Sequence, residues 1–452
     1  MSQGQLYSPY SATSVMAGNV LFISPEVLQS DGLLDINDLK VYMRKTKRNI
    51  SYEKAFKLKS ELLSKAYHTY LSTGTSKNAS ALSDFCQQEA YWLDDYVLYT
   101  LLQRLNEGKA WHQWSDELKN RDQQAIANVL QDYSAELDEL RWQQYIFFQQ
   151  WKRLRAYASS LGISIIGDLP FYASMDSSDV WTHRSLFSVN NIGQIDGVAG
   201  VPPDYFNEDG QLWGMPVYKW DAMQKNDFQW WIQRIAKNAE LYDTIRLDHF
   251  RAFSSYWEIP AGSDSAKSGS WKPGPGVAFF KALLNKVTNV KLIAEDLGEI
   301  SEDVFQLRDQ FTMPGMKVLQ FAFADDNPIS IHAPHNYENT NCIVYTGTHD
   351  NNTTRGWYKD EANSLVKSTL EEYIGRRINE KSISIEMIRL ALKSTAQIAI
   401  IPMQDILNKS TKSRMNTPAS TTGNWKWRLK PEELKPGKTI KKIRKYIEIY
   451  GR

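Results

Sequence analysis

Six short apolar runs between residues 162 and 405 constrain the fold most, because five of them lead into an acidic residue. Runs that are apolar throughout, instead of alternating, predict strands buried on both faces, as in a parallel sheet covered by helices. Acidic residues at the C-terminal ends of several successive strands are typical of the active-site face of a (β/α) barrel. A single acidic residue after one strand could equally cap a helix. The five runs with an acid are ISIIGD, TIRLD, VKLIAE, CIVYTGTHD and QIAIIPMQD, ending at Asp168, Asp248, Glu295, Asp350 and Asp405; KVLQFAF, 317–323, is the sixth.

The chain before these runs has a helical pattern. Apolar residues recur at helical spacing from about Asn37 to Trp114, and a long amphipathic stretch from about Ala135 to Leu161 ends at Gly162. A length of 452 residues fits one elaborated barrel as well as several domains. We therefore expect an α/β fold with one catalytic (β/α)8 barrel of the TIM type over 1–452, in which 35–135 is a mainly helical insertion.

Composition excludes several classes of protein. The 53 basic and 52 acidic residues balance, so no surface for nucleic acid is indicated. No apolar run is long enough for a membrane span, and the first residues lack the pattern of a signal peptide. Two cysteines fit a reducing cytoplasm. The 15 Trp, 23 Tyr and 17 Phe suit a ligand with apolar faces and polar edges.

The Asp248 and Glu295 runs predict a pair of catalytic carboxylates. Arg246 lies two residues before Asp248, on the same face of the strand, where its charge would keep a nucleophilic carboxylate ionised. Glu295 follows the next strand, and a retaining glycosidase needs its two carboxyl groups about 5–5.5 Å apart. A structural ion pair is the alternative for Arg246 and Asp248. Asp296 competes with Glu295, but its side chain should point to the other face.

Asp350 has His349 and Asn351 beside it. A third acid next to an imidazole suits a grip on vicinal sugar hydroxyls that tightens in the transition state. A metal site is the alternative, but the seven histidines contain no HExxH motif or comparable pair. We therefore expect no metal.

Residues 199–221 have the composition of an exposed functional loop that covers the substrate. Prolines and glycines are frequent, and the aromatic side chains would have no core to enter in a surface loop. These side chains are expected to stack over a groove, with ordinary burial as the alternative. They are Tyr205, Phe206, Trp213, Tyr218 and Trp220.

Eight ordered motifs between residues 8 and 428 resemble the 4-α-glucanotransferases, the amylomaltase or disproportionating-enzyme family. They are SPYSATSVMAGN, GDLPFYASMDSSDVW, VPPDYFNEDGQLWGMPVYKWD, IRLDHFRAFSSYWEIPAG, AEDLG, GMKVLQFAF, YTGTHDNNTTRGW and MNTPASTTGNWKWR. The resemblance implies a cytoplasmic enzyme, free of cofactor, that moves α-1,4-glucan segments between maltooligosaccharides.

The resemblance also assigns roles by motif. Asp248 would be the nucleophile, Glu295 the acid/base and Asp350 the stabiliser of the transition state. The remaining assignments concern substrate binding: Arg246, His349, Asp168 and Tyr10 would line the donor glucose site, Tyr205, Phe206 and Trp213 would belong to the loop over the glucan, and Asn416 would bind substrate in a role left open.

The sequence departs from the family pattern in three places. Met215 replaces the Asn of a WGNP motif, and Ala252 replaces a Gly. The family also has two strands before its SPY motif, which stands here at residues 8–10. We therefore expect a barrel that lacks its first strands and a chain that is poorly stable or inactive alone, unless a separate chain supplies those strands.

Two rival functions remain open. An α-amylase-like glucan hydrolase would use the same carboxylates. A truncated, inactive glucan-binding protein would have no reason to keep the acids at 248, 295 and 350. The preferred interpretation is a retaining glucanotransferase; the lengths of its donor and acceptor and its oligomeric state do not follow from the sequence.

Overall fold

The computed structural model describes residues 7–42, 49–73, 76–203, 208–324, 328–420, 422–435 and 437–452. The chain forms two compact units. The first unit comprises Met1–Lys45 with Ser51–Leu292, and the second comprises Thr46–Ile50 with Ile293–Arg452.

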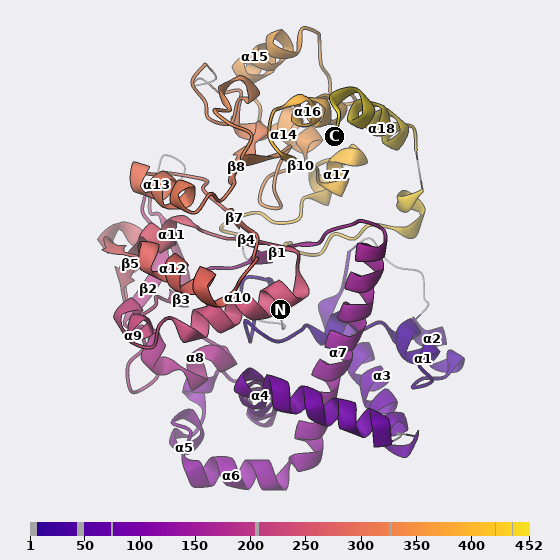
Figure 1. Ribbon diagram of the computed structural model, residues 1–452, viewed down its shortest axis with the longest axis vertical. Coiled ribbons are helices and arrows are strands. Elements are labelled where there is room, and N and C mark those ends of the chain that lie inside the picture. Colours follow the sequence, from indigo (N-terminus) through magenta and orange to yellow (C-terminus); the bar gives the residue numbers. More distant parts are fainter. Residues whose placement is uncertain are drawn as a thin grey trace. The chain divides into compact units, whose positions relative to one another are not determined.

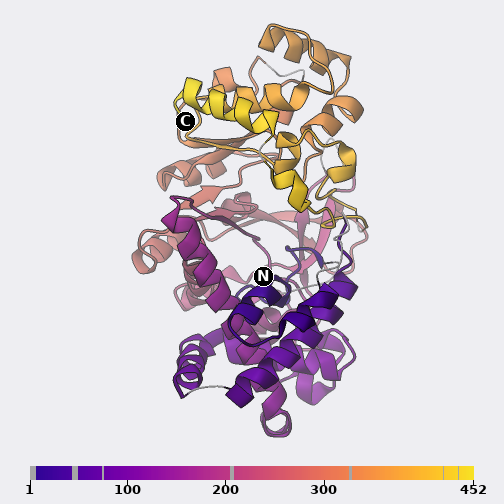
Figure 2. The ribbon, with the colours of Figure 1, turned by 90° about the vertical axis from the view of Figure 1, so that its right-hand side faces the viewer.

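The first unit begins with helices, drawn from indigo to purple in Figures 1 and 2. They are α1 (Pro25–Ser30), α2 (Ile36–Tyr42), α3 (Tyr52–Thr73), α4 (Ser76–Leu105), α5 (Asp116–Lys119), α6 (Gln123–Asp132) and α7 (Ser134–Ser160). The core between α3 and α7 is aromatic: Tyr67 and Tyr70 both contact the buried ring of Trp142. Helix α7 ends just before Gly162, which has a φ of +70°, a conformation that glycine adopts without steric cost.

Two parallel strands follow in the same unit. Strand β1 (Ile166–Leu169) pairs with β4 (Thr244–Leu247), with Asp168 opposite Arg246. The amide of Ile245 donates to the carbonyl of Lys291, so the ladder continues on the other side of β4. Three helices lie between the two strands in the sequence: α8 (Ser178–Thr182), α9 (Trp220–Lys225) and α10 (Gln229–Leu241).

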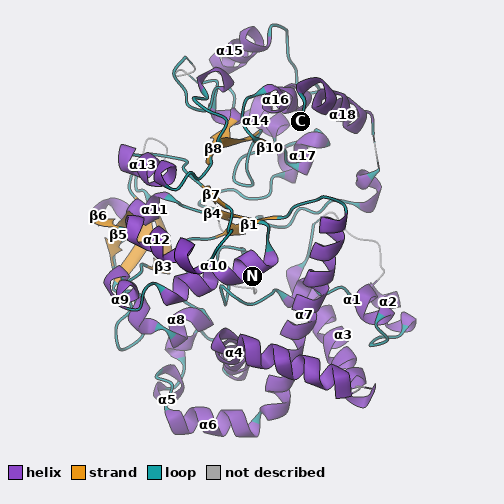
Figure 3. Cartoon of the chain, viewed as in Figure 1, coloured by secondary structure: helices purple, strands orange, loops and turns teal. Residues whose placement is uncertain are grey.

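A separate antiparallel sheet also belongs to the first unit. Its strand order is β3 (Gln211–Pro216), β2 (Gly197–Val201), β5 (Ser255–Pro260) and β6 (Ser270–Pro273). In Figure 3 it is drawn beside α11 (Arg251–Ser254) and α12 (Gly276–Lys286). Most of 199–221 therefore forms a hairpin and the start of α9, not one open loop.

The second unit contains β7 (Leu292–Ala294) from Ile293 onward and a parallel sheet in the order β10 (Ile398–Ile400), β9 (Cys342–Tyr345), β8 (Gly315–Val318). The amide of Ala294 donates to the carbonyl of Pro314, which places β7 beside the start of β8. The helices of this unit are α13 (Glu302–Gln310), α14 (Thr354–Asp360), α15 (Ser364–Ile374), α16 (Ile383–Lys393), α17 (Met403–Ile406) and α18 (Lys438–Tyr450). Buried residues of β9, α14 and α16 make its main core.

The parallel strands with helices between them confirm the predicted α/β class. Three details differ from the prediction. The run 317–323 is only partly a strand, because β8 ends at Val318 and a short 3-10 turn follows. Asp405 lies in α17 instead of at a strand end. Tyr218 and Trp220 are buried in the core, so they are not stacking platforms.

Among the described residues, no helix is both long enough and apolar enough to cross a membrane.

Candidate functional site

One guanidinium group joins two of the predicted acids in the first unit. Arg246, in β4, donates from Nη1 to Oδ1 of Asp168 at 2.6 Å and lies 3.0 Å from Oδ1 of Asp248. The parallel register sets Asp168 directly opposite Arg246. Arg246 is buried, whereas the Asp248 side chain is 25% exposed and so can be reached by a ligand. A buried positive charge at this distance favours the ionised form of a carboxylate.

Tyr10 completes this group from a distant part of the chain. Its hydroxyl donates to Oδ2 of Asp168 at 2.6 Å. Burial, followed by the negative charges of Asp168 and Asp248, raises the pKa of the Tyr10 phenol well above its ordinary value. The phenol therefore stays a hydrogen-bond donor throughout the neutral and mildly alkaline range.

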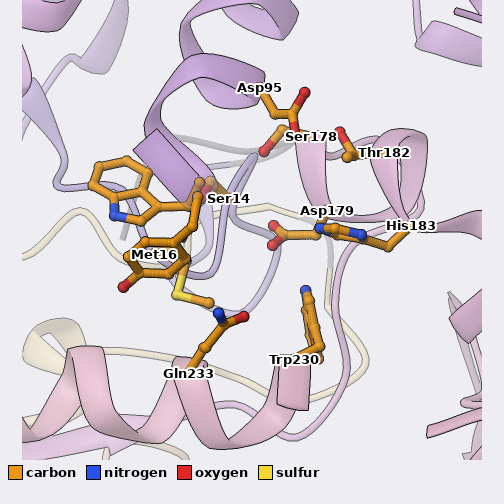
Figure 4. Close-up of a pocket in the computed structure, with 11 residues that line it drawn as sticks. Ser14, Met16, Asp95, Ser178, Asp179, Thr182, His183, Trp230 and Gln233 are labelled. Carbon is orange, nitrogen blue, oxygen red and sulfur yellow. Dashed lines mark hydrogen bonds between the residues drawn. The ribbon is translucent and has the colours of Figure 1, made fainter. Parts of the chain in front are cut away.

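The segment that carries Tyr10 is clamped by the start of α8. The amide of Ser178 donates to the carbonyl of Thr13 at 2.9 Å, and Oδ2 of Asp179 accepts from the amide of Val15 at 2.9 Å. Asp179 lies at a small cavity of about 20 Å³ together with Ser14, Met16, His183, Trp230 and Gln233 (Figure 4). Burial raises the pKa of Asp179 to about 6, although the Val15 amide and Arg234 act in the opposite direction.

Trp213 packs against His249, the residue that follows Asp248. The two ring centroids are 4.9 Å apart and the planes are nearly perpendicular. His249 follows Asp248 directly and has a φ of +50°, a conformation that costs a non-glycine residue energy and often occurs at functional sites. Burial, and then the charge of Arg251, lowers the pKa of His249 to about 4, so this ring is neutral at pH 7.

Glu295 and Asp296, both in the second unit, have different surroundings and therefore different roles. Oε1 of Glu295 accepts from the amide of Leu297 at 3.1 Å. Asp296 is only 3% exposed, pairs with Arg308 at 2.6 Å and accepts from the amide of Met316 at 2.7 Å. Asp296 therefore holds β7, β8 and α13 together and is not available to a substrate.

Asp350 lies in the loop between β9 and α14, five residues after the strand ends. Its Oδ1 accepts from Nδ2 of Asn416 at 2.6 Å and lies 3.4 Å from Nε2 of His349. The His349 ring contacts the ring of Trp425, with centroids 5.5 Å apart. The Asp350 side chain is 47% exposed, so the structure brings three of the predicted residues together around an accessible carboxylate.

Asp405 supports this loop and does not belong to the site. Its carboxylate accepts from the hydroxyls of Thr346 and Thr354 at 2.6 and 2.7 Å, and from the amide of Thr354 at 2.8 Å. It is almost fully buried. Burial raises its pKa, against the effect of these hydrogen bonds. Asp405 thus ties the end of β9 to the start of α14, on either side of Asp350.

Two predicted substrate residues, Tyr205 and Phe206, lie outside the described residues. Within the described part of the chain, no group of three or more His, Cys, Asp or Glu side chains could hold a metal ion. Sequence reasoning missed Asp179, Ser178 and Arg414, because their partners include backbone amides and carbonyls, which leave no signal in the residue pattern.

The comparisons with known proteins agree on one family. A family model described as 4-alpha-glucanotransferase matches residues 1–434. The 4-alpha-glucanotransferase of Aquifex aeolicus is 43% identical over 98% of this chain and 88% of its own length. The chloroplastic/amyloplastic 4-alpha-glucanotransferase of Solanum tuberosum is 42% identical, over 98% of this chain and 77% of its own. The amylomaltase of Streptococcus agalactiae, solved in complex with acarbose, matches with a TM-score of 0.95 at 36% identity, covering 100% of this chain and 90% of its own.

Proposed function

Because this chain belongs to the 4-alpha-glucanotransferase family, it is an enzyme that transfers α-1,4-glucan segments, and we propose that it does so through a covalent glycosyl intermediate on Asp248. The observation that carries this assignment is the contact of Arg246 with both Asp168 and Asp248. A carboxylate held ionised beside a guanidinium, yet open to a ligand, has the properties of a nucleophile.

In the first step an oxygen of Asp248 attacks the anomeric carbon of the donor glucan, and the bond from that carbon to the glycosidic oxygen breaks. Glu295 donates its proton to the departing oxygen. In the second step Glu295 accepts a proton from a hydroxyl of the acceptor glucan, whose oxygen displaces Asp248 from the anomeric carbon. Two displacements at one carbon retain its α configuration.

Glu295 is preferred to Asp296 for the proton transfers because of its surroundings. Asp296 is buried against Arg308 and its acceptor capacity is taken up by the Met316 amide, so it has no access to a glycosidic oxygen. Glu295 precedes it and follows β7 directly. In α/β barrels the active site lies at the C-terminal ends of the parallel strands. The required separation of about 5–5.5 Å between the Asp248 and Glu295 carboxyl groups stays a prediction.

The remaining residues would bind the donor sugar. Asp350 and His349 present an acceptor and an imidazole to vicinal hydroxyls, and the charge of Asp350 would favour the positively charged, flattened ring of the transition state. Tyr10 and Asp168 would line the same glucose site beside Asp248. Acarbose, which the S. agalactiae amylomaltase holds in its solved complex, should therefore bind this chain as well.

The 199–221 segment, through Trp213 and the predicted residues Tyr205 and Phe206, would cover the glucan and exclude water. Water at about 55 M competes with the acceptor sugar, so transfer requires a shielded and positioned acceptor. An α-amylase-like hydrolase, in contrast, uses water as its acceptor and does not need to exclude it. A cytoplasmic location, independence of any cofactor and the absence of nucleic-acid and membrane partners belong to the same proposal.

Incubation with maltotriose followed by thin-layer chromatography tests the function. Glucose together with oligomers longer than maltotriose is the expected product pattern. Glucose and maltose alone would identify a hydrolase, and unchanged maltotriose would mean an inactive chain, either a glucan-binding protein or one without a working site. The variant Asp248→Asn is the control, because it should lose turnover by several orders of magnitude.

A further inference from the structure

Arg414 makes three hydrogen bonds around Asp350, two to other segments and one within its own segment. Nη2 donates to the backbone carbonyl of Asp350 at 2.6 Å, and Nε donates to the carbonyl of Asn416 at 2.8 Å. Nη1 lies 3.4 Å from Oε1 of Glu361, at the end of α14. One guanidinium thus connects the loop after β9, the end of α14 and the segment that carries Asn416.

The same segment holds the Asp350 side chain. Asn416 donates from Nδ2 to the Asp350 carboxylate at 2.6 Å, and its amide donates to the carbonyl of His349 at 3.1 Å. The backbone of Asp350 is held by Arg414, and its carboxylate is held by a residue whose own carbonyl Arg414 also binds. Arg414 therefore contacts the backbone of Asp350 directly and its carboxylate through Asn416.

Glu361 fixes the other side of this arrangement. Its Oε1 also accepts from Nδ2 of Asn352 at 2.8 Å, two residues after Asp350. Asn352 is buried, and its backbone carbonyl accepts from Gln320 at 3.0 Å. Glu361 thus links Arg414 to the far end of the Asp350 loop.

We propose that Arg414 is a positioning residue of this enzyme: it sets the place and orientation of the Asp350 carboxylate, through the Asp350 carbonyl and through Asn416. This inference rests on the role proposed for Asp350. Arg414 does not touch the reacting atoms. Its effect on rate comes from geometry, because a displacement of about 1 Å at a catalytic group can cost on the order of 100-fold in rate.

A lysine cannot replace Arg414 in this role. The planar guanidinium presents donors in fixed directions and reaches the two carbonyls and the carboxylate at once. An ammonium group is a single point on a flexible stem and cannot occupy all three positions. Lys at this position keeps the charge and most of the packing. Arg414→Lys therefore tests the loss of the guanidinium's fixed donor directions alone.

The experiment compares Arg414→Lys and Arg414→Met with wild type in the disproportionation of maltotriose. Both variants should lose kcat by roughly 10- to 100-fold, with KM for maltotriose changed far less, because Asp350 acts mainly on the transition state. A purely structural role would lower thermal stability and leave kcat of the folded fraction unchanged.

Arg376→Met is the matched control. Arg376 pairs with Glu386, which is 5% exposed, within the same unit. Its removal leaves a buried carboxylate without that partner, so stability should fall while kcat is retained. This control separates a general loss of stability from misplacement of Asp350.

A double-mutant cycle with Asn416→Ala gives the second readout. If both residues act on one carboxylate, the combined loss of kcat should be clearly smaller than the product of the two single losses. Wild-type kcat in Arg414→Lys, or fully multiplicative losses in the cycle, would overturn the inference. A wild-type chain without any transfer would instead contradict the proposed function, and an active Asp350→Asn would contradict the role of Asp350.

Discussion

Tyr10 donates its phenolic hydrogen bond to Asp168 at 2.6 Å, although 158 positions separate the two residues in the sequence. Asp168 receives Arg246 on its other oxygen, and Arg246 also reaches Asp248. The phenol, the acid, the guanidinium and the proposed nucleophile therefore form one continuous set of contacts. A substitution of Tyr10 should therefore change the position of Asp248 through Asp168 and Arg246.

Replacing Tyr10 by Phe should lower kcat/KM for maltotriose by roughly 10- to 100-fold. The change removes a hydrogen bond to a charged acceptor, worth about 1.5–3 kcal/mol, and leaves the ring. Steady-state kinetics of glucose release measure the effect. Tyr157→Phe is the control, because it removes an exposed phenol from the same unit outside these contacts. Equal kcat/KM in Tyr10→Phe and wild type would show that the hydroxyl does not serve the site.

Asp179 should make the stability of the first unit depend on pH. The pKa of Asp179 in the folded protein is about 6, above its ordinary value of 3.8. The contribution of Asp179 to the free energy of unfolding is therefore fully present below about pH 3.8 and is lost as the pH rises through about 6. A shift of about two units corresponds to roughly 2–3 kcal/mol in the free energy of unfolding.

The variant Asp179→Asn tests this dependence, because an amide stays neutral and can still accept from the Val15 amide. Denaturant unfolding of wild type and variant at pH 4.5 and pH 8 would be compared. The free-energy difference between the two proteins should move in favour of the variant at the higher pH, and the other carboxylates cancel in this difference. A difference independent of pH would mean that Asp179 titrates normally.

Replacing Trp213 by Ala should slow transfer more than hydrolysis. The ring packs against His249, next to the proposed nucleophile, and its loss would admit water to the covalent intermediate. Assays of free reducing ends and of glucose separate the two rates. Leu212→Ala is a suitable control, since Leu212 is the exposed neighbour on β3. Parallel decreases in both rates would contradict a role for Trp213 in excluding water.

Sequence reasoning reached the parts of the site that lie next to buried strands. A parallel strand requires a continuous apolar run, so the runs located Asp168, Asp248 and Glu295 within or directly after a strand. The same rule failed for Asp405, because an acid after such a run can equally bind two buried threonines. The apolar pattern of 317–323 could not show that a turn begins after Val318.

The supporting residues could not be found in this way. Arg414 binds two backbone carbonyls, and Asp179 binds a backbone amide; every residue offers such groups, so no pattern marks the partners. Tyr10 was reached only through the resemblance of its motif. Its contact with Asp168 depends on how α8 clamps the early segment, which spacing along the chain does not encode.

The covalent step on Asp248 is the central claim, and trapping it is the most direct test. A slow fluorinated glucosyl donor would be incubated with the enzyme, followed by proteolysis and mass spectrometry of the labelled peptide. The account predicts one glucosyl label, on Asp248, with none formed in Asp248→Asn. A label on another carboxylate, such as Asp168 or Asp350, would contradict it.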